Sequence, residues 1–208
     1  MKSKFFFVIY PDSESVKSIL DGMRLIADPS QRNFSHITVK GPYITRQKKR
    51  LLEDNKLVKG QAIQVLGAGR FFADEQSTVF FRCEDNEELY KVWKSKKERT
   101  YKKFHPHITI YDGDDRDFAR KLYEAINSFN IHFYLMAREL EIYASAHKKH
   151  MYNLKTQVDY SFISEVTKID ISQDNVDNLS SRQRITAIRR LCKILKDADK
   201  SRLKVNNS

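Results

Sequence analysis

The tripeptide His-Ile-Thr occurs twice in the chain, at residues 36–38 and again at residues 107–109. On a β-strand, side chains two residues apart point to the same face, so each copy would present an imidazole beside a hydroxyl. Histidine can serve as general acid or general base near neutral pH, because its unperturbed pKa is about 6.5. If the two copies face each other, His36 and His107 could deprotonate an attacking oxygen and protonate a leaving oxygen, while Thr38 and Thr109 hold phosphate oxygens. This chemistry suits a phosphodiester and requires no metal.

Three residues just beyond the motifs are candidates for substrate contacts: Lys40, Tyr43 and Tyr111. A lysine can bind phosphate and a tyrosine can stack on a base, although each also suits ordinary packing or the surface. His105 precedes Pro106, which favours an extended backbone, and we expect it to be structural or to lie at the rim of a cleft. His147 and His150 fall in a polar turn without a neighbouring carboxylate or cysteine, so we expect a solvated loop and no metal site.

The hydrophobic pattern predicts strands and helices that alternate along the chain. The expected strands cover residues 5–10, 34–40, 62–73, 78–83, 104–111, 131–145 and 151–162. The expected helices cover residues 15–26, 45–59, 87–97 and 115–128. Corresponding strands recur at offsets of 73, 71 and 70 residues, and the two motifs occupy equivalent places. The spacing favours a duplicated unit, although mixed chains can also show such spacing by accident.

The motifs stand in the contexts FSHITVKGPY and FHPHITIYDG. With them, residues 1–162 resemble the 2H phosphoesterase superfamily, which includes bacterial 2′-5′ RNA ligase-like proteins and cyclic nucleotide phosphodiesterases. The resemblance implies an α+β fold of two pseudo-symmetric lobes, with antiparallel sheets around a central cleft. It also implies metal-independent chemistry on 2′,3′-cyclic phosphates or 2′-5′ linkages, with no cofactor. By position, His36 would be the proton donor and His107 the acceptor, with the threonines on the phosphate; the near-symmetry of the repeat leaves the reverse assignment open.

Charge is concentrated near the C-terminus. The chain carries 38 basic and 27 acidic residues, a formal net charge of +11, which favours a polyanionic partner such as RNA or a nucleotide. Residues 182–204 contain nine Lys or Arg and two Asp, so they supply +7 of that total. We expect residues 163–208 to form a linker, around 170–178, and a basic amphipathic helix from Ser180 or Ser181 to about Asp197. Its apolar stripe is Ile185, Ile188, Leu191, Cys192 and Leu195.

This helix could contact a polyanion, bind a partner or dock on the body of the protein. We expect docking, because an apolar stripe of that length would otherwise be exposed to water.

Length and composition limit the class of protein. The 208 residues, 40% hydrophobic and 31% charged, suit one globular domain or one domain of two similar halves, and exclude a disordered chain. No apolar run approaches the roughly 20 residues that cross a bilayer, and the run after the N-terminus lacks the features of a signal peptide. Cys83 and Cys192 lie too far apart for a CxxC motif. We therefore expect a cytoplasmic monomer that contacts no membrane.

Two other functions use the same residues. A non-catalytic module could bind RNA ends or a nucleotide with this fold, and a 2′-5′ RNA ligase would run the reverse reaction. Intact histidines favour the enzyme over the binding module, because a binding module has no need of two proton-transfer groups.

Overall fold

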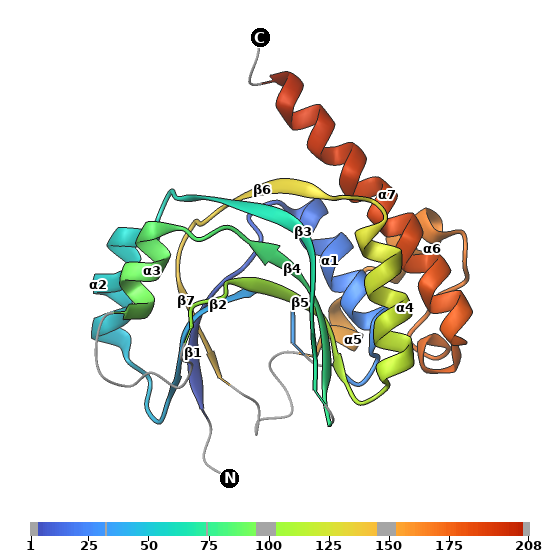
Figure 1. Ribbon diagram of the computed structural model, residues 1–208, viewed down its shortest axis with the longest axis horizontal. Coiled ribbons are helices and arrows are strands. Elements are labelled where there is room, and N and C mark those ends of the chain that lie inside the picture. Colours follow the sequence, from blue (N-terminus) through green and yellow to red (C-terminus); the bar gives the residue numbers. More distant parts are fainter. Residues whose placement is uncertain (1–3, 32, 74, 95–102, 145–152, 206–208) are drawn as a thin grey trace.

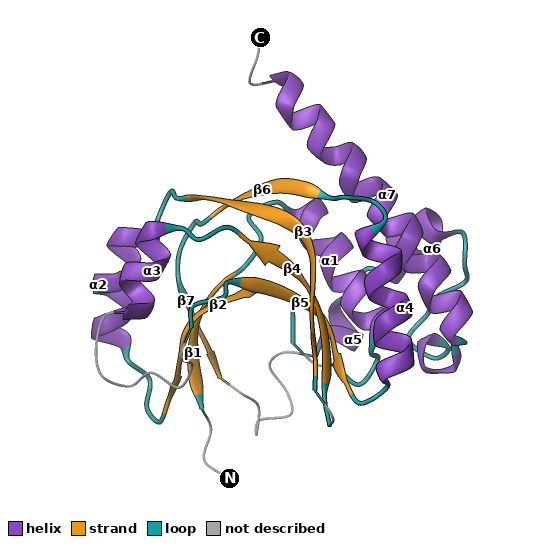
Figure 2. Ribbon diagram, viewed as in Figure 1, coloured by secondary structure: helices purple, strands orange, loops and turns teal. Residues whose placement is uncertain are grey.

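The structure, a computed structural model, describes residues 4–31, 33–73, 75–94, 103–144 and 153–205, the last eight by their backbone alone. Its centre is one seven-stranded sheet whose neighbouring strands are all antiparallel (Figure 1 and Figure 2). In spatial order the strands are β6 (His132–Met136), β3 (Ala62–Phe72), β4 (Ser77–Cys83), β5 (His107–Gly113), β2 (Ile37–Tyr43), β1 (Phe5–Ile9) and β7 (Glu141–Ala144). The predicted α+β class is confirmed, with one continuous sheet where separate sheets were expected.

Helices flank the sheet in two groups (Figure 2). The smaller group consists of α2 (Lys48–Val58) and α3 (Glu87–Lys94). The larger group consists of α1 (Glu14–Ala27), α4 (Arg116–Asn127), α5 (Leu154–Gln157), α6 (Tyr160–Thr167) and α7 (Ser181–Val205), with the 3-10 helix η1 (Val176–Asn178) before α7. Within the described residues, no helix is both long enough and apolar enough to cross a membrane.

Helix α1 matters most for the site. It begins after Ser13, whose hydroxyl accepts the Val16 N–H at 3.5 Å, a side-chain cap of the kind that favours a helix start. The apolar residues at helical spacing, Val16, Ile19, Leu20, Met23 and Ile26, are buried. Every residue from Leu20 to Ala27 is buried as well. The second half of α1 is therefore enclosed on all sides, because it packs against both β5 and α7.

The register of the sheet supports the internal repeat. Ile37 of β2 pairs with Ile108 of β5, 71 residues later, and Gln64 of β3 pairs with Tyr134 of β6, 70 residues later. An antiparallel pairing centred on two equivalent residues is what a two-fold axis between two copies of one unit produces. Pairs within the two halves also correspond: Ile9–Ile37 with Phe81–Ile108, and Val8–Thr38 with Phe80–Thr109.

The last two predicted strands, over residues 131–145 and 151–162, are wrong in part or in full. The strand expected over residues 131–145 is interrupted between β6 and β7, where the Leu140 N–H donates to Asn55 Oδ1 at 2.8 Å. The strand expected over 151–162 is helical where it is described, because Asn153 and Asp159 cap α5 and α6. Their side chains accept backbone N–H groups at 3.2 and 2.9 Å. The predicted turn at 146–150 lies outside the described residues.

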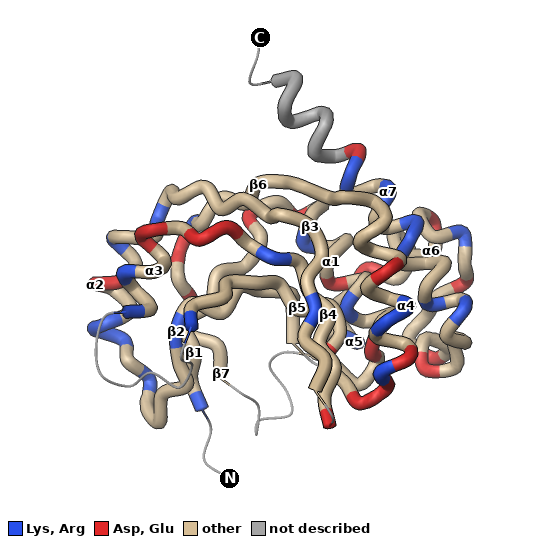
Figure 3. Tube along the Cα trace, in the orientation of Figure 1, with Lys and Arg blue, Asp and Glu red and all other residues tan. Residues whose placement is uncertain are grey.

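Helix α7 docks on the body, as its apolar stripe predicts. Ala187, Ile188, Leu191, Cys192 and Leu195 are fully buried, and α7 packs against α1, α4 and α6. Basic residues lie on its outer side, and neighbouring α4 carries charges of both signs (Figure 3). Helix α6 crosses the domain boundary expected at residue 162. The segment expected as a linker contains the buried Ile171 and Val176, so it also packs against the body.

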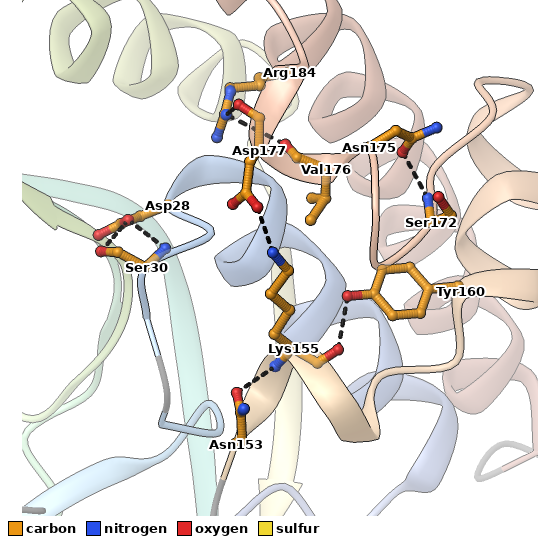
Figure 4. A network of polar contacts seen from close by, with 10 residues as sticks. All are labelled: Asp28, Ser30, Asn153, Lys155, Tyr160, Ser172, Asn175, Val176, Asp177 and Arg184. Atoms are coloured by element: carbon orange, nitrogen blue, oxygen red, sulfur yellow. Dashed lines mark hydrogen bonds and ion pairs between the residues drawn. The ribbon is translucent and has the colours of Figure 1, made fainter. Parts of the chain in front are cut away.

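A network of polar contacts fixes this docking (Figure 4). The Arg184 guanidinium donates to carbonyl oxygens of Ile26 in α1 and of Leu179, both at 2.9 Å, and to those of Val176 and Asp177. Lys155 forms an ion pair with Asp177, which joins α5 to η1. Because α1 is held between the sheet and these helices, the docked C-terminal segment also steadies the helix that reaches the site.

Candidate active site

One small cavity is lined by the histidines and threonines of both His-Ile-Thr motifs, as was expected from the sequence. His36 immediately precedes β2 and Thr38 lies within it, whereas His107 is the first residue of β5 and Thr109 follows. The cavity has a volume of about 140 Å³. Its other lining residues are Phe6, Arg24, Asn33 and Tyr143.

Side-chain alternation along the two strands brings these groups together. Ile37 and Ile108, the central residues of the motifs, are fully buried and pair with each other. Because neighbouring residues of a strand point to opposite faces, the flanking histidines and threonines turn away from that core contact and toward the cavity. The predicted alternation is confirmed in both motifs.

Both imidazoles are held in the same way. Nδ1–H of His36 donates to the Phe34 carbonyl at 2.7 Å, and Nδ1–H of His107 donates to the His105 carbonyl at 2.6 Å. A carbonyl oxygen can only accept, so Nδ1 carries the proton in each ring and Nε2 is left for proton exchange. Each acceptor lies two residues before its histidine, so the same local backbone geometry orients both rings.

The two rings differ in their electrostatic surroundings. Burial, followed by the positive charge of Arg24, lowers the pKa of His36 to about 4. Burial also lowers the pKa of His107, but the hydrogen bond to the His105 carbonyl and the Asp112 carboxylate act in the opposite direction. Both imidazoles are therefore mainly neutral at pH 7 in the free protein, and His107 is the one with a carboxylate that favours its protonation.

Arg24 of α1 brings a lasting positive charge to the cavity. It is only 6% exposed, and its guanidinium donates to the Thr109 carbonyl at 2.6 Å and to Gln31 Oε1 at 3.0 Å. Burial lowers the pKa of Arg24, yet a guanidinium keeps its proton in proteins. In the part of the chain that the structure describes, no carboxylate forms an ion pair with it. Its charge is therefore available to an anion in the cavity.

Asp21, one turn before Arg24, supports the site from behind. Its carboxylate accepts the Ser35 N–H at 2.6 Å and so fixes the backbone immediately before His36. Burial raises the pKa of Asp21 to about 6. Neither Asp21 nor Arg24 was predicted from the sequence as part of the site. The available signal was a pair of charges three residues apart in the otherwise apolar second half of α1.

Tyr143 of β7 was also missed. Its ring stacks on His36, with centroids 5.3 Å apart and planes 28° from parallel. Phe6 of β1 is the strand partner of Tyr143, and the centroids of these two rings are 6.1 Å apart. Burial raises the pKa of Tyr143, whose hydroxyl is hydrogen-bonded to Asn33. Nothing in the local sequence marks Tyr143. Its partner Phe6 corresponds to Thr78, the partner of Phe71, so Tyr143 is the equivalent of Phe71 in the repeat.

The three predicted substrate contacts lie away from the cavity. Lys40 is buried and donates to the Val92 carbonyl of α3 at 2.7 Å. Tyr43 packs in the core against Phe7, and Tyr111 packs there against Phe118. The register of β2 shifts between Thr38 and Lys40, and that of β5 shifts between Thr109 and Tyr111. These irregularities turn Lys40 and Tyr111 to the face opposite the motifs, and all three residues have structural roles.

The remaining histidines play smaller parts. His105 supplies the carbonyl that orients His107, and its side chain lines a neighbouring cavity. His147 and His150 lie outside the described residues. Among the residues that are described, no three His, Cys, Asp or Glu side chains form a group that could hold a metal ion.

The sequence matches no model of a known protein family, and no curated protein is similar to it. Function therefore has to be inferred from the residues of the cavity.

Proposed function

We propose that this chain is a metal-independent phosphodiesterase of the 2H type, acting on 2′,3′-cyclic phosphate, 2′-5′-linked or cyclic (oligo)nucleotide substrates. The observation that carries the proposal is the convergence of both His-X-Thr pairs and Arg24 on one cavity. A phosphodiester anion needs a cation and hydroxyl donors for its free oxygens, and proton-transfer groups for its two reacting oxygens. The cavity supplies each of these.

The arrangement of the sheet supports a 2H-type architecture. Two halves related by a local two-fold axis would be the two lobes, and the axis would pass between Ile37 and Ile108. In such an arrangement the two imidazoles approach a bound phosphate from opposite sides, as an in-line displacement requires.

In the proposed hydrolysis, Arg24, Thr38 and Thr109 hold the non-bridging oxygens of the phosphate. One neutral imidazole takes a proton from water through Nε2 as the water oxygen forms a bond to phosphorus. The other imidazole, protonated, donates through Nε2 to the ester oxygen as that P–O bond breaks. A cyclic phosphate is thereby opened to a monoester, and exchange with solvent restores the two protonation states.

The electrostatics favour His107 as the acid and His36 as the base, the reverse of the assignment that the family resemblance implies. His36 lies near Arg24 and its pKa of about 4 keeps it neutral, as a base must be. The Asp112 carboxylate favours a proton on His107. A bound phosphodiester raises the pKa of both rings, and His107 would be the first to gain a proton.

The proposal can be tested by a turnover screen in the presence of EDTA. The substrates are 2′,3′-cyclic mononucleotides, 2′-5′-linked oligonucleotides and cyclic dinucleotides. We expect metal-free hydrolysis of at least one class, and a fall of about 10²–10⁴-fold in either His36→Ala or His107→Ala. The double variant should lose far less than the product of the two single effects, because the histidines act as a unit.

His132→Ala is the matched control, because His132 is an exposed histidine on edge strand β6. It should retain wild-type turnover. Near-wild-type turnover in either motif variant would contradict the proposal. Binding of these nucleotides without turnover would instead identify a binding module, and joining of ends without hydrolysis would identify a ligase.

A further inference from the structure

The catalytic cavity is too small for a whole nucleotide. Pockets that enclose a small organic ligand usually measure about 300–1,000 Å³, whereas this one measures about 140 Å³. It can hold the phosphodiester group, so the attached nucleoside must lie on the surface beside it. An aromatic surface on which a nucleoside could lie adjoins His107.

We propose that Phe71, packed on the buried ring of Phe80, forms a nucleobase-stacking subsite on the His107 side of the cavity. This proposal rests on the proposed function, because it concerns the part of a phosphodiester substrate that the cavity leaves outside. It defines the substrate as one with a nucleobase attached on that side of the phosphate.

The strand register places the subsite on the catalytic face. Phe80 of β4 pairs directly with Thr109, so the two side chains point to the same face of the sheet. Gly69 of β3 is the partner of Phe80 on its other side. A Cβ at Gly69 would lie 2.3 Å from the Phe80 ring, so glycine is required for that ring to lie across β3.

The rings form a continuous series that ends at the imidazole. The centroids of Phe71 and Phe80 are 4.6 Å apart, and that of Phe80 is 4.8 Å from His107. Phe71 is 6.1 Å from His107 and meets it edge-on, at 81°. A base stacked on Phe71 would therefore lie next to the imidazole that serves the phosphate.

Phe71 also has an open surface, with 49% of the residue exposed. Its equivalent in the repeat, Tyr143, is nearly parallel to His36 and stacked on it, and it lies close to Phe6. Phe71 instead meets its imidazole edge-on and remains half exposed. The two sides of the cavity are therefore unequal, and the base belongs on the His107 side. Stacking on an exposed aromatic ring is how proteins commonly hold unpaired bases.

The test measures binding of a fluorescent product analogue, 2-aminopurine ribonucleoside 3′-monophosphate, whose emission falls when the base stacks. Ribose 3-phosphate is the probe without a base. We expect quenching with the wild type, and affinity for the fluorescent probe lower by between about fivefold and about 150-fold in Phe71→Ala. Binding of ribose 3-phosphate should stay unchanged, because it does not reach Phe71.

Two further variants keep the test independent of folding. Phe71→Leu preserves an apolar side chain beside Phe80 but has no ring face, so it should also lose quenching. Leu52→Ala, at a 67% exposed apolar position on α2, should behave as the wild type. Affinity and quenching within twofold of wild type in both Phe71 variants would overturn the subsite.

Failure of the subsite and failure of the proposed function can be told apart. A wild type that hydrolyses cyclic mononucleotides, with a KM unaffected by Phe71→Ala, would retain the function and overturn the subsite. A wild type that shows Phe71-dependent quenching but no turnover would retain the subsite and overturn the function. A wild type with neither quenching nor turnover would overturn both.

Discussion

The titration of His36 gives a prediction that depends on the structure of the site and not on catalysis. Its pKa is about 4 in the folded chain and about 6.5 in the unfolded chain. The unfolded chain therefore takes up a proton more readily, and the contribution of His36 to stability is lost as the pH falls from about 6.5 to 4. Linkage between these two values predicts a loss of about 2 kcal/mol between pH 7.5 and pH 5.

The measurement is urea unfolding of the wild type and of His36→Gln at both pH values. Asp21 opposes the effect in the wild type, because its folded-state pKa is raised to about 6 and it gains a proton on folding in this range. The difference between the two proteins isolates His36, since Asp21 is present in both. His132→Gln is the control, because its ring faces solvent in the folded chain. If the loss of stability between pH 7.5 and pH 5 differs by less than about 0.5 kcal/mol between the wild type and His36→Gln, burial does not lower the pKa of His36.

Three further perturbations test the surroundings of the site. Arg24→Met should raise the KM for a phosphodiester about 10–150-fold, because a charge-assisted contact is lost. It should also raise the pKa of His36 in an NMR titration, because the positive charge beside that ring is removed. An unchanged pKa would show that the charge of Arg24 does not act on His36. Asp112→Asn removes a carboxylate that favours protonated His107, so the pKa of His107 should fall while that of His36 stays constant. Leu191→Ala should lower the free energy of unfolding by about 2–5 kcal/mol, because this side chain of α7 is fully buried where the helix packs on the body. Wild-type stability in that variant would show that α7 is not docked.

The motif residues could be predicted from the sequence because their placement depends only on the two-residue period of a strand. That period held between His36 and Thr38 and between His107 and Thr109. It failed one step later, where irregular register turned Lys40 and Tyr111 into the core. A β-bulge of this kind leaves no clear pattern in a single sequence, so residues beyond it cannot be assigned to a face.

The remaining errors have other physical causes. Arg24 reaches the cavity from a helix, and only tertiary packing reveals which buried charge on that helix meets the strands. The stretch after residue 153 carries enough apolar and aromatic residues to be taken for a strand. The caps Asn153 and Asp159 favour a helix instead, because each side chain accepts a backbone N–H at a helix start. In a strand that N–H would pair with a neighbouring strand.

For the proposed acid–base chemistry, the similarity of the two motifs raises a problem. Two copies of one unit provide two equal imidazoles, each held through Nδ1 by the carbonyl two residues before it. Acid–base catalysis needs unequal ones, one neutral and one protonated. The inequality comes from outside the motifs: Tyr143 covers His36, whereas Phe71 leaves the surface beside His107 open and Asp112 favours a proton there. In the proposed reaction, the imidazole that donates the proton lies on the same side of the cavity as the stacked base. His107 would therefore protonate the oxygen that carries the nucleoside stacked on Phe71.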